Sequence, residues 1–365
     1  MSPIGLDMNS IRSVIIATGS YIPEHKVYNK DFLHHNFLNP DGSPIVGDKS
    51  RIINKFKEIT GIDERRYAGE DQKASNLAAL AALDALNSGG IDKETLDYII
   101  VAHNFGDVAY RGNRIDMVPS LASRVKYQLQ ISNPYCIAYD LAFGCPGWVQ
   151  GLIQADYYIR SGDAKRCLVI GTETLSRVVD QHDRDSMIYA DGGGAAIIQA
   201  SQQGTGAGVI AHLSKTYANE HAMLLTMDKS YNPEIDEKDI FIKMNGRRLY
   251  EFALTYVPQL IKETLDKAGL NITDISKVLI HQANEKMDHA ILERLFKLYG
   301  ITEYLNAIMP MTISWLGNSS VASIPTLLDL IQKGKINDQQ ITSGDKVVFA
   351  SVGAGMNINA VIYQF

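Results

Sequence analysis

The sequence has few cysteines and lacks the common metal, nucleotide and hydrolase motifs. Only three cysteines, Cys136, Cys145 and Cys167, occur in 365 residues, and no two of them form a C-x-x-C pair. Such spacing supports neither a disulfide framework nor a zinc site of the usual kind. The patterns H-E-x-x-H, G-x-x-x-x-G-K-[ST] and G-x-S-x-G are also absent.

The sequence also lacks a surplus of positive charge, a targeting segment and a long apolar run. It has 35 Lys and Arg against 41 Asp and Glu, a net charge of -6, which argues against non-specific nucleic-acid binding. No apolar run approaches the roughly 18 residues that a membrane-spanning helix needs, and the start has no signal-peptide layout. We predict a soluble, cytoplasmic protein that binds neither nucleic acid nor membranes.

What the sequence does contain is an internal similarity. Residues 90–102, GIDKETLDYIIVA, resemble residues 269–281, GLNITDISKVLIH, because each segment begins at a glycine, passes a polar turn and enters a short apolar strand. A helix precedes each segment, over 75–89 and 256–269. The offset of 179 residues (269 minus 90) is about half the chain, and it far exceeds the ~20–50 residues of a solenoid repeat.

A second pair of segments extends the similarity. Residues 143–174 and 316–355 each contain an apolar residue, a glycine, a small or polar residue, a helix, a glycine that ends it, and a buried apolar strand. Alternating strands and helices indicate an α/β fold with buried sheets. We predict two similar halves, residues 1–202 and 203–365, joined in the polar stretch 200–208.

Reactive side chains stand at the carboxyl ends of predicted strands, where α/β sheets bind their ligands. Cys145 follows the apolar run 137–143, and a helix over 148–162 comes next. A helix N-terminus favours a thiolate, so this position predicts a lowered pKa and a nucleophile. The alternative is a buried, inert cysteine, which is our interpretation of Cys136 and Cys167.

His281 and Asn318 occupy two further strand ends. His281 directly follows an apolar strand, and it is either functional or a satisfied structural residue. Asn318 is the counterpart of Cys145 in the repeat, and its alternative role is a helix N-cap. The glycines of residues 349–358, FASVGAGMNI, permit an unusual turn. The N–H groups of that turn could belong to an oxyanion hole or to a plain connection between strands.

Together these motifs resemble the β-ketoacyl-acyl-carrier-protein synthase III family of the thiolase superfamily. The ordered set Cys, HQAN and GNSS is the most specific part of the resemblance, which covers nearly the whole chain. The segments that carry it are TGSYIPE (18–24), TGIDERR (60–66), the turn at Cys145, YADGGGAAII (189–198), HQAN (281–284), GNSSVASIP (317–325) and VGAG (352–355).

The resemblance implies a thiolase-like fold with two βαβαβαββ halves in a five-layered αβαβα arrangement, usually as a homodimer. It implies that Cys145 takes an acyl group from a thioester. His281 and Asn318 then hold the thioester carbonyl of malonyl-ACP while CO₂ is lost, and the enolate attacks the acyl-cysteine. Backbone N–H groups of Cys145 and Ala354 form the oxyanion hole. The product, 3-oxoacyl-ACP, initiates fatty acid synthesis, and no metal or redox cofactor takes part.

The resemblance also implies residues that bind the substrates. Arg184, Gly246 and Asn284 match positions that contact coenzyme A or its phosphopantetheine arm. Lys286 matches a carrier-contacting arginine. The residues predicted to bind acyl carrier protein are Gln282, Lys286, Arg247 and Arg248, while Arg294 and Lys297 either extend this basic patch or are ordinary surface charges.

Some features depart from the family pattern. Lys55 or Phe56 stands where the family has a tryptophan, and Ile59 where it has an arginine, so coenzyme A would be gripped differently. The acyl donor is therefore either acyl-CoA or acyl-ACP. Segments 34–51 and 104–116 are additional and border the substrate tunnel or dimer interface in the family. The alternatives are a head-to-head condensation of long chains, a resorcinol-type or polyketide condensation, acyl transfer, and a catalytically silent binding or partner subunit.

Overall fold

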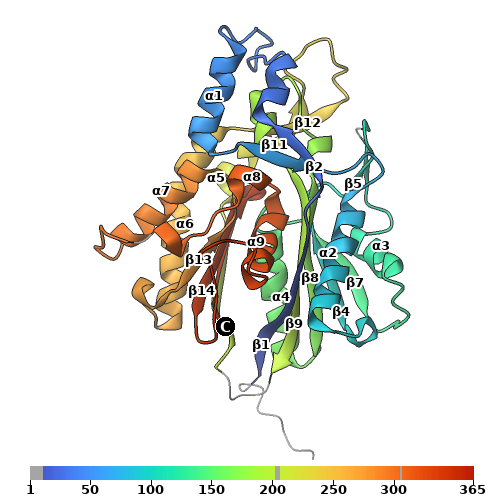
Figure 1. Cartoon of the computed structure of the whole chain (residues 1–365), viewed down its shortest axis with the longest axis vertical. Helices are drawn as coiled ribbons and strands as arrows, with labels where there is room; N and C mark the ends of the chain where they lie inside the picture. Colours follow the sequence, from blue (N-terminus) through green and yellow to red (C-terminus); the bar gives the residue numbers. More distant parts are fainter. Residues whose placement is uncertain (1–10, 113, 202–205, 305) are drawn as a thin grey trace, which may run out of the picture.

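The structure, a computed structural model, describes residues 11–112, 114–201, 206–304 and 306–365. Within them the chain forms two main sheets, one from each part of the sequence (Figure 1). The predicted boundary at residues 202–203 lies outside the described residues and stays a prediction.

The first sheet follows the predicted pattern of its half. Its five strands, in spatial order, are β1 (Arg12–Tyr21), β9 (Asp191–Ser201), β8 (Arg166–Thr174), β4 (Tyr98–Ala102) and β7 (Ile137–Leu141). β4 pairs in parallel with β7 and β8, whereas β9 is antiparallel to β8 and β1. With α2 (Ala74–Gly89), α3 (Leu121–Gln128) and α4 (Gly147–Ser161), the chain order is β1-α2-β4-α3-β7-α4-β8-β9.

The second sheet has one strand fewer. Its strands, in spatial order, are β10 (Gly208–Thr216), β15 (Asn357–Gln364), β14 (Lys346–Gly353) and β13 (Lys277–Ile280). The described residues 306–312 form no strand where the repeat predicts one. Pro310 has no N–H for a ladder, and the N–H of Thr312 donates to Gln282 Oε1 at 2.8 Å instead.

The two sheets and their helices form five layers. In Figure 1, α4 and α9 (Ser323–Gln332) lie between the sheets, and α2 and α3 cover the outer face of the first sheet. The outer face of the second is covered by α6 (Gly246–Ala268) and α7 (Glu285–Lys297). This αβαβα order confirms the predicted fold class.

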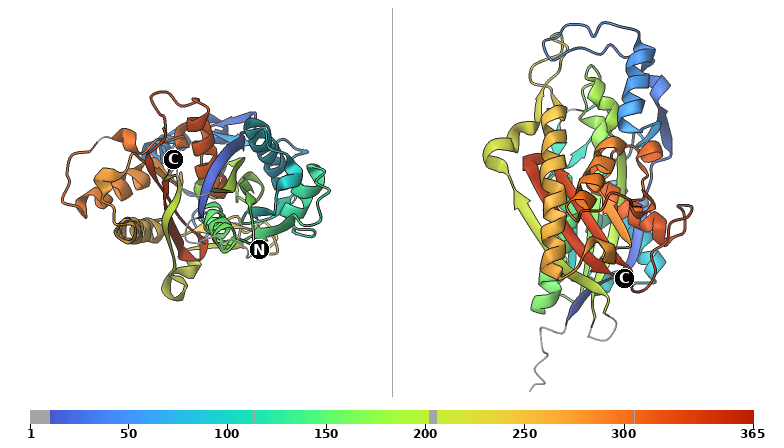
Figure 2. Two further views of the ribbon diagram at one scale, coloured as in Figure 1. Left: turned by 90° about the horizontal axis from the view of Figure 1, so that it is seen from below. Right: turned by 90° about the vertical axis from the view of Figure 1, so that its left-hand side faces the viewer.

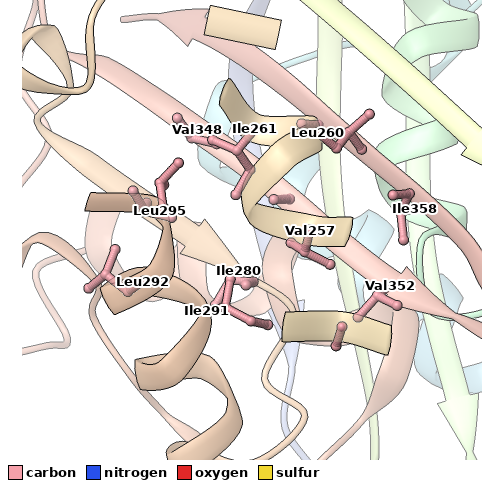
Figure 3. Packing of buried hydrophobic residues seen from close by; sticks show 14 of the residues in the cluster. Val257, Leu260, Ile261, Ile280, Ile291, Leu292, Leu295, Val348, Val352 and Ile358 are labelled. Carbon is pink, nitrogen blue, oxygen red and sulfur yellow. The ribbon is translucent and has the colours of Figure 1, made fainter. Parts of the chain in front are cut away.

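The second sheet is held to its outer helices by branched apolar side chains (Figure 3). Val257 and Ile261 on α6 and Ile291 on α7 pack with Ile280 and Val348 of the sheet, and all five are buried. Burying such a side chain contributes roughly 1.5–3 kcal/mol. The position of β13, and of the histidine that follows it, is therefore fixed by this core.

Helix α6 begins ten residues earlier than the predicted start at 256. Asn245 caps it by accepting a hydrogen bond from the N–H of Arg248 at 3.3 Å. Pro258 lies inside the helix and cannot donate to the carbonyl of Leu254. Arg294 Nη1 donates to that carbonyl at 3.2 Å, so Arg294 has a structural role. The residue is also exposed, and its place in the basic patch stays a prediction.

One end of the molecule carries small elements that frame the site. α1 (Lys49–Thr60) and the hairpin of β11 (Leu225–Lys229) and β12 (Ile240–Met244) gather at the top of Figure 1 and of the right-hand view in Figure 2. The remaining α-helices and strands are β2 (His25–Tyr28), β3 (Glu64–Tyr67), β5 (Asp107–Val108), β6 (Ile115–Asp116), α5 (Ala218–His221) and α8 (Ile313–Leu316).

Short 3₁₀ turns connect these elements, and they are η2 (Asn29–His34), η3 (Lys93–Thr95), η4 (Leu175–Arg177), η5 (Arg184–Ile188), η6 (Ala222–Leu224), η7 (Ile272–Asp274), η8 (Asn306–Ile308), η9 (Ser320–Ala322) and η10 (Ala354–Met356). Across the described part of the chain, no helix has the length and apolar character needed to cross a membrane. The cytoplasmic location stays a prediction.

Candidate active site

A cavity of about 970 Å³ opens beside the cysteine that follows β7. Cys145 from the first half and His281 and Asn318 from the second half all line it, and so does Gly353, the last residue of β14. The structure therefore brings together the three side chains that the sequence predicted as a triad.

Cys145 stands two residues before the first residue of α4, as the sequence predicted. Gly144 makes the turn with φ +68°, a conformation that favours glycine, and Pro146 occupies the N-cap position. The expectation of a lowered thiol pKa is wrong, because burial raises the pKa of Cys145 to about 11. Ser320 opposes this rise, and the charge of Glu173 adds to it.

The glycine loop after β14 packs directly on the cysteine turn. A Cβ on Gly144 would lie 2.8 Å from the backbone N of Ala354, and a Cβ on Gly353 would lie 2.5 Å from the backbone N of Cys145. Only glycines permit so close an approach. The two backbone N–H groups predicted as an oxyanion hole therefore belong to segments in direct contact, and their role stays a prediction.

His281 directly follows β13 and is buried, with 3% of its surface exposed. Its backbone N–H donates to the carbonyl of Ala350 at 2.9 Å, and its Nδ1 lies 2.9 Å from Ser323 Oγ. Burial lowers the pKa of His281 to about 4. The imidazole is therefore neutral near pH 7, with Nδ1 engaged by Ser323.

Asn318 is held by its own backbone neighbours. Its Oδ1 accepts a hydrogen bond from the N–H of Ser320 at 2.8 Å, and its backbone N–H donates to Ile188 at 3.0 Å. The N-cap residue of α9 is Ala322, so Asn318 is not a helix cap. Because its amide oxygen is used, the NH₂ group is the one that can donate into the cavity.

The residues predicted to bind the substrate arm line the same cavity. Arg184, Gly246 and Asn284 all do so. Asn284 also caps α7, because its Oδ1 accepts a hydrogen bond from the N–H of Met287 at 2.8 Å. Their contact with coenzyme A or phosphopantetheine stays a prediction.

The predicted carrier-binding residues divide into exposed and buried ones. Lys286, Arg247 and Arg248 are exposed, and Arg247 lies 3.1 Å from Glu251. Gln282 is completely buried, with Nε2 donating to the carbonyl of Ile280 at 3.0 Å. Its assignment to the carrier surface is therefore a mistake, since its side chain links β13 to the segment before α8.

The two additional segments, residues 34–51 and 104–116, differ in whether they line the cavity. Residues 34–51 contribute Leu38, Ile45 and Arg51 to the cavity lining, as expected for a segment that borders the tunnel. Of the described residues in 104–116, none lines it. The three residues that depart from the family pattern at the mouth, Lys55, Phe56 and Ile59, line the cavity as well.

Sequence reasoning missed several polar residues near the site. Glu173 is the last residue but one of β8 and has 1% of its surface exposed, and its Oε1 accepts a hydrogen bond from the N–H of Asn104 at 3.0 Å. Lys243 is buried on the cavity wall with its Nζ 2.6 Å from Asp180. The sequence did contain a signal for Glu173, because an acidic residue stands at the end of the apolar run RCLVIGTE. The rule that ligands bind at the carboxyl ends of strands, which singled out Cys145, could have singled out Glu173 as well.

No group of three or more His, Cys, Asp or Glu side chains with metal-ligand geometry occurs among the described residues. The prediction that the protein needs no metal or redox cofactor remains a prediction.

The five layers and their two related halves define a thiolase-like fold. A family model described as 3-oxoacyl-[acyl-carrier-protein] synthase III matches residues 139–217. A second model, described as the C-terminal part of the same synthase, matches residues 265–365. The β-ketoacyl-ACP synthase III of Clostridium tetani is 33% identical over 367 residues, covering 96% of this chain and 98% of that protein.

Another relative and a solved structure agree with these matches. Synthase III 1 of Halalkalibacterium halodurans is 31% identical over 94% of this chain and 96% of its own. The crystal structure of synthase III from Thermus thermophilus has a TM-score of 0.78 and 30% identity, covering 96% of this chain and 99% of that one. The chain belongs to the β-ketoacyl-ACP synthase III family.

Proposed function

We propose that this protein catalyses the decarboxylating condensation that extends an acyl group on Cys145 with malonyl-ACP to give 3-oxoacyl-ACP, which initiates fatty acid synthesis. The observation that supports it most is one cavity lined by the Cys145 thiol, the His281 imidazole and the Asn318 amide. Family membership supports the same reaction.

In the first step the Cys145 thiolate attacks the carbonyl carbon of an acyl thioester. The negative charge develops on the carbonyl oxygen, where backbone N–H groups of Cys145 and Ala354 would receive it. The donor thiol leaves with a proton, and the acyl group stays on Cys145 as a thioester. The contact between the glycine loop and the cysteine turn supports this assignment.

In the second step malonyl-ACP loses CO₂, and the electron pair of the broken C–C bond forms an enolate. The NH₂ group of Asn318 and the Nε2–H of the neutral His281 imidazole would stabilise the enolate oxygen. This role of His281 requires the tautomer in which Nδ1 accepts the proton of Ser323 Oγ, 2.9 Å away. One such donor in a dry site is worth about 3–4 kcal/mol. The enolate carbon attacks the acyl-cysteine, and the Cys145 thiolate leaves.

The charges at the cavity mouth support a phosphate-bearing substrate arm. Four cationic residues line the cavity with exposed side chains, and they are Arg51, Lys55, Arg184 and Arg247. Both coenzyme A and a phosphopantetheinylated carrier carry phosphate there. The exposed Lys286, Arg247 and Arg248 support an acidic carrier as partner.

A homodimer is part of the proposal. β7 is at the edge of the first sheet, and Ile137 at its start is 49% exposed. An unpaired edge strand is a template for a second chain, so we expect the molar mass in solution to be twice that of one chain.

Intact-mass spectrometry tests the first step. The protein is incubated with a panel of acyl-CoA and acyl-ACP donors, and we expect one acyl mass to be added to the wild type. Cys145→Ala should gain no adduct. Cys167→Ala is the matched control, because that thiol is completely buried in β8, and it should gain the same adduct as the wild type.

The donor that gives the adduct also identifies the carrier and the chain length. An adduct that survives Cys145→Ala, or no adduct with any donor, would contradict the proposed first step. If an adduct forms but malonyl-ACP gives no 3-oxoacyl product, the condensation is not the reaction of this protein.

A further inference from the structure

We propose that Asn359, on β15, is a positioning residue for the oxyanion hole. Its amide holds the cysteine turn, residues 144–147, so that the N–H groups of Cys145 and Ala354 can reach one oxygen atom. Ala354 belongs to the glycine loop, residues 353–355. The inference rests on the proposed function, because it names the side chain that places these donors for acyl transfer to Cys145.

Strand β15 directs Asn359 into the core between the two sheets. Successive side chains of a strand point to opposite faces, and Val361 and Tyr363, two and four residues further on, pack in the core that contains Trp148 and Leu152 of α4. Asn359 shares their face, toward α4 (Figure 1), and is completely buried. An amide buried in such a core needs a hydrogen-bond partner.

The partner is the carbonyl group of Pro146, the residue after the nucleophile. Asn359 Nδ2 donates to Pro146 O at 2.9 Å. The N–H of Gln150 donates to the same oxygen at 2.9 Å, so this carbonyl already has the partner that an α-helix supplies. The bond from Asn359 is therefore not needed to satisfy Pro146. What it adds is a link between the second sheet and the peptide next to Cys145.

The oxygen of the same amide is left without a partner. Asn359 Oδ1 is buried and accepts no hydrogen bond from any described residue, a state that costs roughly 1–3 kcal/mol. Because Pro146 offers an oxygen, the NH₂ group faces it and Oδ1 faces away. A buried polar atom that reduces stability in this way is typical of a residue with a functional task.

Asn357, two residues earlier on the same face of β15, holds the other segment of the oxyanion hole. Its Nδ2 donates to the carbonyl of Ala354 at 2.8 Å, and its Oδ1 accepts a hydrogen bond from Thr216 Oγ1 at 2.6 Å. One strand thus holds the glycine loop through Asn357 and the cysteine turn through Asn359. The two N–H donors are therefore positioned relative to each other by β15.

The two segments also touch at the proline that Asn359 binds. A Cβ on Gly353 would lie 2.7 Å from Pro146 Cδ. An oxyanion-hole donor acts when it lies about 2.7–3.1 Å from the developing oxyanion, and a misplacement of about 1 Å can slow a reaction roughly 100-fold. Release of Pro146 from Asn359 should therefore slow any reaction that passes through an oxyanion.

The test compares two reactions of the Cys145 thiolate. With para-nitrophenyl acetate, the sulfur bonds to the carbonyl carbon, negative charge develops on the carbonyl oxygen, and nitrophenolate leaves with the electron pair of the broken C–O bond. With iodoacetamide, the sulfur attacks a saturated carbon and iodide leaves, so no oxyanion forms. Absorbance of nitrophenolate, corrected with Cys145→Ala, measures the first rate, and peptide mass measures the second.

The decisive variant is Asn359→Leu, because leucine has a similar shape and removes the donor together with the unpaired Oδ1. We expect its acylation to be roughly 10- to 100-fold slower than that of the wild type, with alkylation unchanged. Asn359→Ala, which adds no atoms, should show the same split. Urea unfolding establishes that each variant is folded.

Two further variants sharpen the result. Asn357→Ala should also slow acylation without changing alkylation, because the carbonyl of Ala354 is no longer held. Ser351→Ala is the matched control. Ser351 pairs with Asn359 across β14 and β15, is completely buried, and its hydroxyl has no hydrogen-bond partner among the described residues. Both of its rates should equal those of the wild type.

An unchanged acylation rate in folded Asn359→Leu or Asn359→Ala would overturn the inference. An equal fall in both reactions would do the same, since the thiolate and not the oxyanion hole would then be disturbed. Slow acylation in Ser351→Ala, failure of both Asn359 variants to fold, or a wild type that para-nitrophenyl acetate does not acylate would each overturn it as well.

The proposed function fails separately. If acyl-CoA and acyl-ACP donors give no adduct, but Asn359→Leu is acylated by para-nitrophenyl acetate more slowly than the wild type and alkylated at the same rate, the condensation fails and the role of Asn359 stands.

Discussion

The turns at Cys145 and Asn318 are counterparts in the internal repeat, but only the first connects a strand to a helix, because the helix α8 precedes Asn318. Each begins at a glycine with positive φ, +68° at Gly144 and +70° at Gly317. In the first copy α4 begins two residues after the cysteine. In the second, the turn η9 intervenes and α9 begins five residues after Asn318.

The later start of α9 gives Asn318 a different setting from that of Cys145. Near a helix N-terminus, free N–H groups and the helix dipole favour negative charge, which suits a thiolate. Asn318 stands further from its helix and uses its amide oxygen on the N–H of Ser320. Its NH₂ group remains for a developing oxyanion. The proposed roles of the two side chains agree with where each helix starts.

The largest effect expected from this comparison is a separation of the two steps. Asn318→Ala should still accept an acyl group on Cys145 but should condense roughly 100- to 1,000-fold more slowly, because one oxyanion donor is lost. Loading is measured by intact mass and condensation by product formation. Cys145→Ala is the reference, and it should lose both. Failure of Asn318→Ala to load would show that the two turns do not act in separate steps.

A second difference, between the side chains that the two halves contribute to the site, concerns the pH dependence of stability. Unfolded His281 binds a proton near pH 6.5, whereas folded His281 does so only near pH 4. The low pKa of folded His281 therefore contributes fully to the free energy of unfolding above pH 6.5. This contribution is lost as the pH falls toward 4. The half-buried Cys145 has the opposite effect. The pKa of its thiol is raised from 9.0 to about 11, so its contribution to stability is lost as the pH rises from 9 toward 11.

The expected size of the histidine effect is about 2 kcal/mol in unfolding free energy between pH 7 and pH 5. Urea unfolding of wild type and His281→Gln at both pH values measures it. The variant should lose less stability on acidification than the wild type by about that amount. Parallel pH profiles for the two proteins would contradict the low pKa of His281.

The smallest effect concerns the two glycines themselves. Gly317→Ala should destabilise the protein by roughly 2 kcal/mol more than Gly269→Ala, because the new Cβ would lie 2.6 Å from Arg65 Cβ. Gly269 is the matched control, since its φ is +67° and nothing lies within 4 Å of an added Cβ. Thermal unfolding midpoints measure the difference.

Gly144→Ala tests whether the first turn is equally tight. Its Cβ would meet the backbone of Ala354, so we expect a similar destabilisation together with slower acyl loading. A Gly144→Ala protein as stable as Gly269→Ala would show that the backbone at Ala354 can move to make room for the new Cβ. The turns at Gly144 and Gly317 would then differ in how tightly they are packed.

The fold was predictable because it depends on patterns that repeat along the chain. The helices over 75–89 and 148–162 were found to within one residue at each end, since glycines with positive φ end them. Helix α6 was predicted ten residues too short. The reason is that Arg294, far along the chain, satisfies the carbonyl that Pro258 leaves free.

The site was only partly predictable. Cys145 and His281 follow strands, and the repeat relates Asn318 to Cys145, so the sequence could single out all three, although a helix rather than the predicted strand precedes Asn318. Gln282 was misplaced because its neighbours gave no sign that Thr312 would bind its amide. Asn104 and Glu173 are 69 residues apart, and no local pattern indicates that they meet beside Cys145.

The sequence by itself determined the duplicated α/β architecture and the three reactive side chains, because apolar periodicity, glycine positions and strand ends are local properties. Tertiary structure alone decided the state of those side chains. Burial raised the pKa of the thiol that the sequence predicted to be lowered and kept His281 neutral. A pKa depends on solvent exclusion and on neighbours from distant segments, and only the folded chain brings Glu173, whose charge raises the pKa of Cys145, near the cysteine.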